Sequence, residues 1–169
     1  MLQYFAYGSN LDFAHLARLG IDVLAAERGI LGGWRLTFNV VDSGIDCGAV
    51  GVGLANLERC DRPAPNAATN ARMTAWQVAE GAILTLDARS LPRLDAYENY
   101  PVDYDRQILD ILNATGQTVP CWVYFGQPNC LGENLKPTRP FLQKILAGRN
   151  FLSAAYYQDL AAIATLDPN

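Results

Sequence analysis

The sequence is poor in the residues that several kinds of protein site require. Its 169 residues include one histidine, two lysines (Lys136 and Lys144) and four cysteines that form no C-x-x-C pair. A cysteine–histidine zinc site, a Schiff-base lysine and a polybasic surface are therefore not expected. The 13 basic residues are scattered singly and the net charge is −4, which makes nucleic acid a poor candidate partner.

Long apolar runs are missing as well. No stretch approaches the ~18 residues of a membrane span, and the N-terminus lacks the basic region and apolar stretch of a secretion signal. Because 50% of the residues are hydrophobic and 18% are charged, we expect one globular domain over residues 1–169, in the cytoplasm and with reduced cysteines. No metal and no cofactor is expected. The oligomeric state stays open, with a homodimer as one alternative.

The most informative stretch lies near the N-terminus. Tyr4 to Tyr7 is aromatic and apolar, which predicts a short buried strand. The strand ends at Gly8-Ser9-Asn10, three turn formers, and helical spacing begins at Asp12. A strand that turns into a helix directs free backbone N–H groups at one point, which suits a carboxylate or an oxyanion. An ordinary strand-to-helix connection explains the same pattern equally well.

The remaining chain predicts strands in the middle and helices around them. Strands are expected near residues 25–31, 34–41, 48–57, 77–86, 104–112 and 117–125, the first two either separate or as one bent strand. The glycine- and alanine-rich strand at 48–57 suggests close approach to a ligand or another backbone. Helices are expected at 87–97, 137–147 and 153–166, and residues 58–74 form a long loop, either a mobile surface loop or an active-site lid. This order predicts an α+β fold with a small closed or strongly curled, barrel-like mixed β-sheet flanked by helices.

Three stretches of the sequence together carry a recognisable pattern. They are F-A-Y-G-S-N-L behind the first strand, V-A-E-G-A-I-L-T-L at residues 78–86, and L-D-A-Y-E-N from Leu94 to Asn99. Their order and spacing resemble the γ-glutamylcyclotransferase family, whose third motif reads L-D-x-x-E-G. A weaker match continues through Tyr124 to about Tyr157. Asn99 replaces the usual glycine, and asparagine is the residue that next best tolerates a left-handed backbone.

The resemblance implies a small γ-glutamyl substrate that closes on itself to 5-oxoproline and releases an amine, a reaction of glutathione metabolism. Glu98 matches the family's proton carrier. The backbone of Tyr7, Gly8 and Ser9 would hold the glutamyl carboxylate or carbonyl oxygen, beside a wall formed by Tyr4, Phe5 and Ala6. Asn10 belongs to the same substrate-binding turn, and Tyr124 is carried over as a polar contact. The alternatives without a functional role are that Glu98 is a solvated surface glutamate and that Tyr124 is a buried structural tyrosine.

One departure from the family pattern concerns the leaving group. Phe141 falls where the family often has a substrate-contacting tyrosine, so the lost hydroxyl puts that contact in doubt. The same fold acting on a γ-glutamylamine or a γ-glutamyl-protected intermediate is therefore one alternative, and a non-enzymatic ligand-binding or interaction domain is another. Ser9 lacks the G-x-S-x-G context of a nucleophile. His15 is expected on a helix surface.

Overall fold

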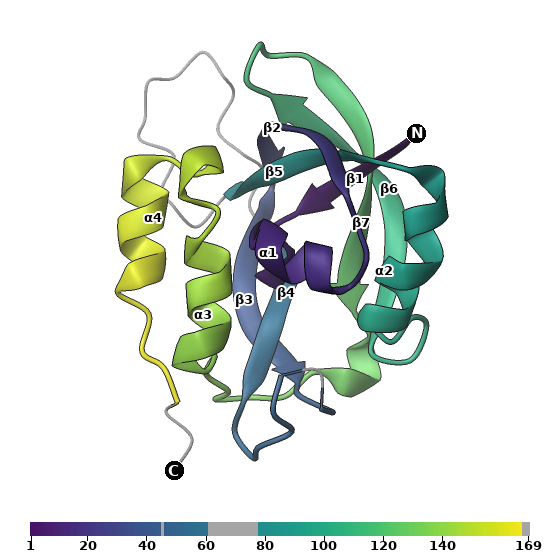
Figure 1. Ribbon diagram of the computed structural model, residues 1–169. Coiled ribbons are helices and arrows are strands. Elements are labelled where there is room, and N and C mark those ends of the chain that lie inside the picture. Colours follow the sequence, from purple (N-terminus) through teal and green to yellow (C-terminus); the bar gives the residue numbers. More distant parts are fainter. Residues whose placement is uncertain (45, 61–77, 167–169) are drawn as a thin grey trace.

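The computed structural model describes residues 1–44, 46–60 and 78–166, and these residues form the predicted α+β fold (Figure 1). Five strands close into a mixed barrel in the order β1-β5-β2-β6-β7, in which β1 runs parallel to β7 and the other neighbours are antiparallel. The barrel strands are β1 (Leu2–Ala6), β2 (Val23–Gly32), β5 (Val78–Leu86), β6 (Tyr104–Asn113) and β7 (Thr118–Gly126). Closure pairs both edges of the sheet.

A separate two-stranded sheet consists of β3 (Trp34–Val41) and β4 (Gly53–Arg59). The alternative of one bent strand over 25–41 is therefore wrong: the chain turns at Gly33, where φ is +78°, and β3 leaves the barrel to pair with β4. The strand expected at 48–57 begins only at Gly53. A side chain at Gly53 would overlap the carbonyl oxygen of Phe38, so this strand does pass close to another backbone.

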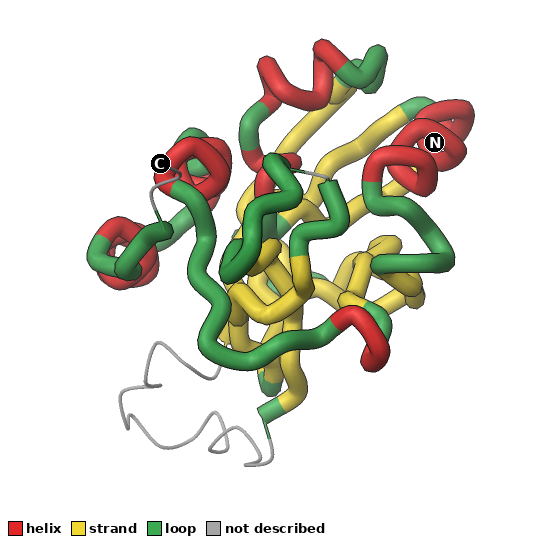
Figure 2. The backbone as a smooth tube through the Cα atoms, turned by 90° about the horizontal axis from the view of Figure 1, so that it is seen from below, coloured by secondary structure: helices red, strands yellow, loops and turns green. Residues whose placement is uncertain are grey.

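Helices cover the outside of the sheets (Figures 1 and 2). The α-helices are α1 (Phe13–Arg18), α2 (Leu91–Tyr97), α3 (Arg139–Leu146) and α4 (Ala154–Ala161). Short 3-10 turns lie at η1 (Ser9–Leu11), η2 (Ala88–Ser90), η3 (Pro128–Cys130) and η4 (Arg149–Phe151). Ser153 caps α4 through its hydroxyl, as expected, but that helix ends at Ala161 and not at Leu166. Most of the predicted 58–74 loop lies outside the described residues; its first two residues belong to β4.

The two faces of β1 separate the packed interior of the barrel from the side that carries the site. Phe5 points inward, where its ring, Ile83 and Ile111 lie within about 3 Å of the position that a side chain at Gly29 would occupy. Tyr4 points to the opposite face, because successive side chains of a strand alternate. There its ring meets that of Tyr124 edge-on, with the centroids 5.9 Å apart. The interior is thus filled, and the outer face presents tyrosines.

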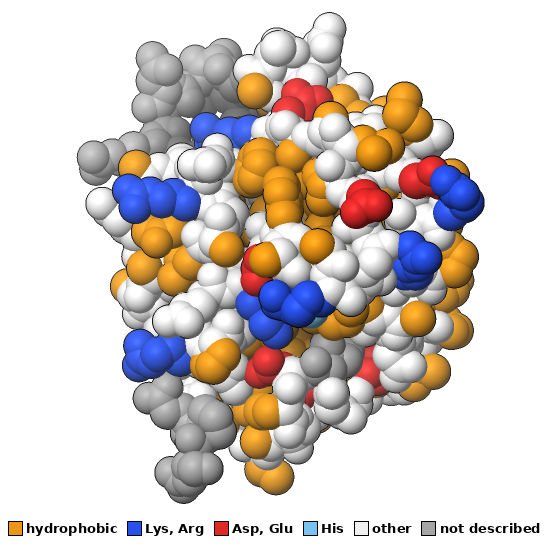
Figure 3. Space-filling model, in the orientation of Figure 1, with side chains coloured by type: hydrophobic (Ala, Val, Ile, Leu, Met, Phe, Trp, Pro, Cys, Tyr) orange, Lys and Arg blue, Asp and Glu red, His pale blue; other side chains and the backbone are white. Residues whose placement is uncertain are grey.

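The described helices are short, none exceeding eight residues, and none of them is both long and apolar enough to cross a membrane. On the face seen in Figure 1, the Lys and Arg side chains lie in separate places between acidic and apolar ones (Figure 3).

Candidate functional site

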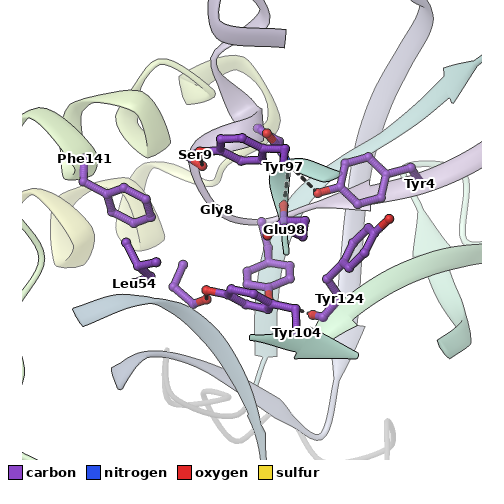
Figure 4. Close-up of a pocket in the computed structure, with 12 residues that line it drawn as sticks. Tyr4, Gly8, Ser9, Leu54, Tyr97, Glu98, Tyr104, Tyr124 and Phe141 are labelled. Carbon is purple, nitrogen blue, oxygen red and sulfur yellow. Dashed lines mark hydrogen bonds between the residues drawn. The ribbon is translucent and has the colours of Figure 1, made fainter. Parts of the chain in front are cut away.

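A small pocket opens on the outer face of the barrel, between the turn after β1, the end of α2, β4 and α3. Gly8, Ser9 and Glu98 line it together although 90 positions separate the first from the last. Figure 4 shows Glu98 between Phe141 and Leu54 on one side and Tyr4 and Tyr124 on the other. The lining residues are Tyr4, Tyr7, Gly8, Ser9, Asn10, Leu54, Ala55, Tyr97, Glu98, Tyr104, Tyr124 and Phe141.

The turn after β1 is a tight one. The N–H of Leu11 donates to the carbonyl of Gly8 at 3.0 Å, and that of Asp12 donates to Ser9 at 3.1 Å, which forms η1. The first N–H groups of such a helical turn have no acceptor within it, so they are free to meet an anion. Gly8 has φ −111° and therefore does not need a left-handed backbone. Its constraint is space: an added Cβ would lie 3.2 Å from Cβ of Ala55.

Glu98 ends α2, and its N–H donates to the carbonyl of Leu94 at 2.9 Å. The chain then turns through Asn99 at φ +50°, the left-handed conformation that the sequence predicts for this position. Oε1 of Glu98 accepts a hydrogen bond of 2.8 Å from Nδ2 of Asn10. The helix end thus directs one carboxylate at the turn that follows β1.

Burial raises the pKa of Glu98 from 4.5 to about 8, while the hydrogen bond from Asn10 acts in the opposite direction. Burial also raises the pKa values of Tyr4, Tyr7 and Tyr104 well above 10. These hydroxyls therefore stay neutral near pH 8, whereas Glu98 exchanges a proton there. A carboxyl group of this kind can act as an acid or a base at neutral pH.

Asn10 links the carboxylate to the tyrosines. Its Nδ2 also donates to the Tyr4 hydroxyl at 2.8 Å, and its side chain is 2% exposed. The Tyr124 hydroxyl donates to Oδ1 of Asp95 at 2.7 Å, so its proton is engaged away from Glu98. Tyr124 thus lines the pocket as a buried residue with a structural partner.

The structure divides the residues that the sequence predicts for the site. Tyr4, Tyr7, Gly8, Ser9, Asn10, Glu98 and Tyr124 lie together at the pocket. Phe5 and Ala6 do not line it: both are fully buried, and Phe5 faces the barrel interior because it alternates with Tyr4. The Tyr7 hydroxyl donates to the carbonyl of Tyr124 at 2.7 Å, which makes it a tie between the turn and β7.

Four further residues line the pocket: Leu54, Ala55, Tyr97 and Tyr104. Leu54 and Ala55 are not among the predicted residues, whereas the places of Tyr97 and Tyr104 beside Glu98 in the sequence predict a partly apolar wall around it. The Tyr97 hydroxyl lies 3.1 Å from the Ser9 hydroxyl, and that of Tyr104 donates to the carbonyl of Ala55 at 2.8 Å. The sequence offered a signal for each: the tyrosines are neighbours of Glu98, and the small residues of 48–57 indicate close approach. Phe141, for which the sequence resemblance implies a tyrosine in the family, also lines the pocket.

His15 is not a surface residue. It is 8% exposed, its ring packs against Tyr97 with centroids 4.8 Å apart, and burial lowers its pKa. The expectation was wrong because His15, in the six-residue helix α1, lies on the side of that helix that meets Tyr97 at the end of α2.

A group of three side chains with metal-ligand chemistry, Asp42, Asp46 and Cys47, lies outside the pocket lining. The Asp42 carboxylate accepts N–H groups from Gly44, Asp46, Cys47 and Gly48, and Asp46 accepts from Thr138 at 2.7 Å and lies 3.6 Å from Nζ of Lys144. These oxygens already have protein partners. The group therefore serves as a loop anchor.

The closed five-stranded mixed barrel with its additional small sheet and flanking helices is a fold that solved γ-glutamyl cyclotransferases share. The structure titled γ-glutamyl cyclotransferase aligns with a TM-score of 0.74 at 19% identity, over 99% of this chain and 90% of that one. The uncharacterized protein loc79017 of Homo sapiens aligns equally well, at TM-score 0.74 and 21% identity over 99% and 90% of the two chains. At these identities the likeness establishes the fold.

The family follows from the sequence. Residues 4–143 match the family model "Gamma-glutamyl cyclotransferase, AIG2-like", and the chain belongs to this family. A Drosophila melanogaster protein, CG2811, named as a candidate γ-glutamylcyclotransferase, is 40% identical over 45 residues. That match spans 27% of this chain and 29% of the fly protein, so it supports only the shared segment.

Proposed function

We propose that this protein cyclises a small γ-glutamyl compound to 5-oxoproline and releases an amine, with Glu98 as the proton carrier. Membership of the family supports an enzyme of the γ-glutamyl cyclotransferase kind. The observation that carries the finer proposal is the shared pocket: a carboxyl group with a pKa of about 8 faces the same small space as the Gly8–Ser9 turn. A base and an anion-binding turn are what this reaction needs.

The reaction is intramolecular. The α-amino nitrogen of the γ-glutamyl group attacks the γ-carbonyl carbon, a C–N bond closes the five-membered ring, and the C–N bond to the leaving amine breaks. The protein supplies no nucleophile and holds the substrate folded back on itself, which lowers the entropic part of the barrier. Backbone N–H groups of the turn after β1 would hold the substrate carboxylate or the oxygen that becomes negative.

The protons balance without water or a co-reactant. The substrate nitrogen starts as an ammonium and ends as a lactam N–H, so it loses two protons; the leaving nitrogen gains two when it departs as an ammonium. Glu98 takes protons from the first nitrogen and returns them to the second. An α-amino group has a pKa near 8, so transfer to a carboxylate of similar pKa is close to energetically level.

Substrate binding would also bring Glu98 into its reactive form. In the empty pocket at pH 7 a group with a pKa of about 8 is mostly protonated. A substrate ammonium within ~4–6 Å favours the carboxylate and lowers that pKa. Proton release and substrate binding are then coupled.

The wall opposite Tyr4 and Tyr124 would receive the leaving amine. Leu54 and Phe141 form this side and offer no hydroxyl to the leaving group (Figure 4). Phe141 supports the alternative that the donor is a γ-glutamylamine or another γ-glutamyl derivative, because the tyrosine contact is replaced by an apolar ring.

Replacing Glu98 with glutamine tests the proposal. Glutamine keeps the size and an acceptor for Asn10 but cannot take a proton. We expect Glu98→Gln to lower 5-oxoproline release ~10²–10⁴-fold, since general-base assistance is of that size. The matched control Glu133→Gln removes an exposed carboxylate elsewhere and should leave turnover unchanged. Turnover of Glu98→Gln within about twofold of wild type would place the proton carrier elsewhere, because that is under ~0.5 kcal/mol.

A further inference from the structure

One side chain, Arg106 of β6, contacts the chain on both sides of Glu98. Its Nε lies 3.1 Å from Oδ1 of Asp95, three residues before Glu98. Its guanidinium carbon lies 4.7 Å from the ring centroid of Tyr100, two residues after Glu98. The segment from Asp95 to Tyr100, which we call the Glu98 corner, is therefore held at both of its ends by the Arg106 guanidinium.

Arg106 is itself fixed to the barrel. It is the cross-strand partner of Tyr124, and its guanidinium carbon also lies 4.6 Å from the ring centroid of Trp122 in β7. The cation thus lies between two aromatic rings, one from the corner and one from the barrel. A planar guanidinium can stack on two rings and still pair with a carboxylate, whereas a lysine ammonium cannot reproduce that geometry.

The Asp95 carboxylate contacts both Tyr124 and Arg106. Its Oδ1 accepts the Tyr124 hydroxyl at 2.7 Å and lies beside Nε of Arg106. The side chains of Arg106 and Asp95 are 17% and 22% exposed, so salt screens this pair less than a surface pair. The backbone adds a further link, because the N–H of Tyr100 donates to the carbonyl of Asp95 at 2.9 Å.

We propose that Arg106 is a positioning residue for Glu98: by holding Asp95 and Tyr100 against β6 and β7, it fixes where the end of α2 places the carboxylate in the pocket. This inference rests on the proposed function for its kinetic consequence but not for its structural one. Displacement of a reacting group by 1 Å can cost ~10²-fold in rate. If the Glu98 corner were no longer held against β6 and β7, water would also reach the Glu98 carboxylate.

The test compares Arg106→Met and Arg106→Lys with the control Arg89→Met, which removes an exposed arginine paired with Asp87 at 2.8 Å. The first readout is the NMR titration of the Glu98 carboxyl carbon, assigned by its loss in Glu98→Gln. The groups that face Glu98 are the Asn10 amide, which does not titrate, and five tyrosine hydroxyls with pKa values above 10: Tyr4, Tyr7, Tyr97, Tyr104 and Tyr124. Among these groups and Glu98, only Glu98 titrates between pH 5 and 9. The imidazole of His15, which packs on Tyr97, is followed by its own ring signals.

In Arg106→Met we expect the Glu98 midpoint to fall by at least half a pH unit as water reaches the carboxylate. We also expect kcat to fall about 10-fold with KM within twofold. Arg106→Lys should recover less than half of the loss, and Arg89→Met should show neither change. A wild-type titration midpoint and kcat in Arg106→Met would overturn the inference.

A second variant covers the case in which Arg106→Met does not fold. Tyr100→Leu removes one of the two rings from a residue that is 36% exposed, and the same downward shift is expected at smaller size. An unchanged Glu98 midpoint in that variant would overturn the inference as well. If the wild-type protein releases no 5-oxoproline, the proposed function fails, while the titration still decides the role of Arg106.

Discussion

Asp42 and Glu98 are both carboxyl groups at the end of a regular element, and the protein shifts their pKa values in opposite directions. Burial acts to raise both. At Asp42 four backbone N–H groups outweigh it and lower the pKa, whereas at Glu98 a single amide hydrogen bond does not, and the pKa rises to about 8. The four N–H donors aimed at Asp42 therefore make it a permanent anion, whereas Glu98, with a single donor, titrates near neutral pH.

The surroundings of Asp42 and Glu98 also differ in the parts of the chain that form them. The loop after β3 wraps its own backbone around Asp42, so that carboxylate belongs to the scaffold. Glu98 is surrounded by side chains from distant parts of the chain, chiefly tyrosines and Asn10. A ligand can change the second environment but hardly the first.

Removing the Asp42 carboxylate should have the largest effect on stability. Asp42→Ala leaves four N–H groups without their charged acceptor, and we expect a loss of ~3–4 kcal/mol in the free energy of unfolding at pH 7. Urea denaturation measures it. Asp42→Asn retains one acceptor oxygen and should lose about half as much. A loss below ~1 kcal/mol in Asp42→Ala would show that the loop does not depend on this group.

The pH dependence of stability should carry the signature of Glu98. Its pKa is higher in the folded than in the unfolded state, so ionisation favours unfolding, and stability falls as the pH rises from about 4.5 towards 8. The expected fall by pH 7 is on the order of 3 kcal/mol. Glu98→Gln should remove it and raise the melting temperature at pH 7 relative to wild type.

Asp42 acts at the other end of that curve. Its lowered pKa gives stability that is present above its unfolded pKa and is lost as the pH falls through the folded one. Glu98→Gln should therefore keep the acid limb of the wild-type curve and flatten only the limb above pH 4.5. A Glu98→Gln protein whose stability still falls between pH 4.5 and 8 as in wild type would contradict the assignment.

Removing the Asn10 amide, which donates to Glu98, should increase the difference between the pKa values of Glu98 and Asp42. Asn10→Ala takes away the hydrogen bond that favours the carboxylate, so the pKa of Glu98 should rise further and turnover at pH 7 should fall about 10-fold. The acid limb of the pH–rate profile reports it. Tyr4→Phe removes the other partner of Asn10 and should leave that limb in place. Equal profiles for the two variants would mean that Asn10 acts through packing alone.

The smallest expected effect concerns Gly8. Gly8→Ala puts a methyl group 3.2 Å from that of Ala55, so β4 must move by a few tenths of an ångström. We expect less than ~1 kcal/mol of destabilisation and a KM raised a few-fold. The double variant Gly8→Ala/Ala55→Gly removes the contact and should restore KM. Without that restoration, Gly8 would matter for substrate approach and not for packing.

The sequence predicted the local parts of the site and missed the parts that depend on topology. The turn at Gly8–Asn10, the left-handed Asn99 and the presence of the strands β1 and β6 near them could be predicted from neighbouring residues. The burial of His15 and the inward direction of Phe5 could not, since each depends on which element lies opposite. The same holds for Arg106 and Asp95, which meet only because β6 passes beside α2.

The pocket lies outside a barrel whose interior is already filled by Phe5, Ile83 and their neighbours. Substrate preference and the folding core therefore occupy different volumes. Leu54 and Phe141, on β4 and α3, could diverge among descendants of this protein, or be randomised in a laboratory library, while the barrel strands and the Glu98 corner stay constant. On the proposed function, such a division would let one scaffold accept substrates with different leaving amines without first losing its ability to fold.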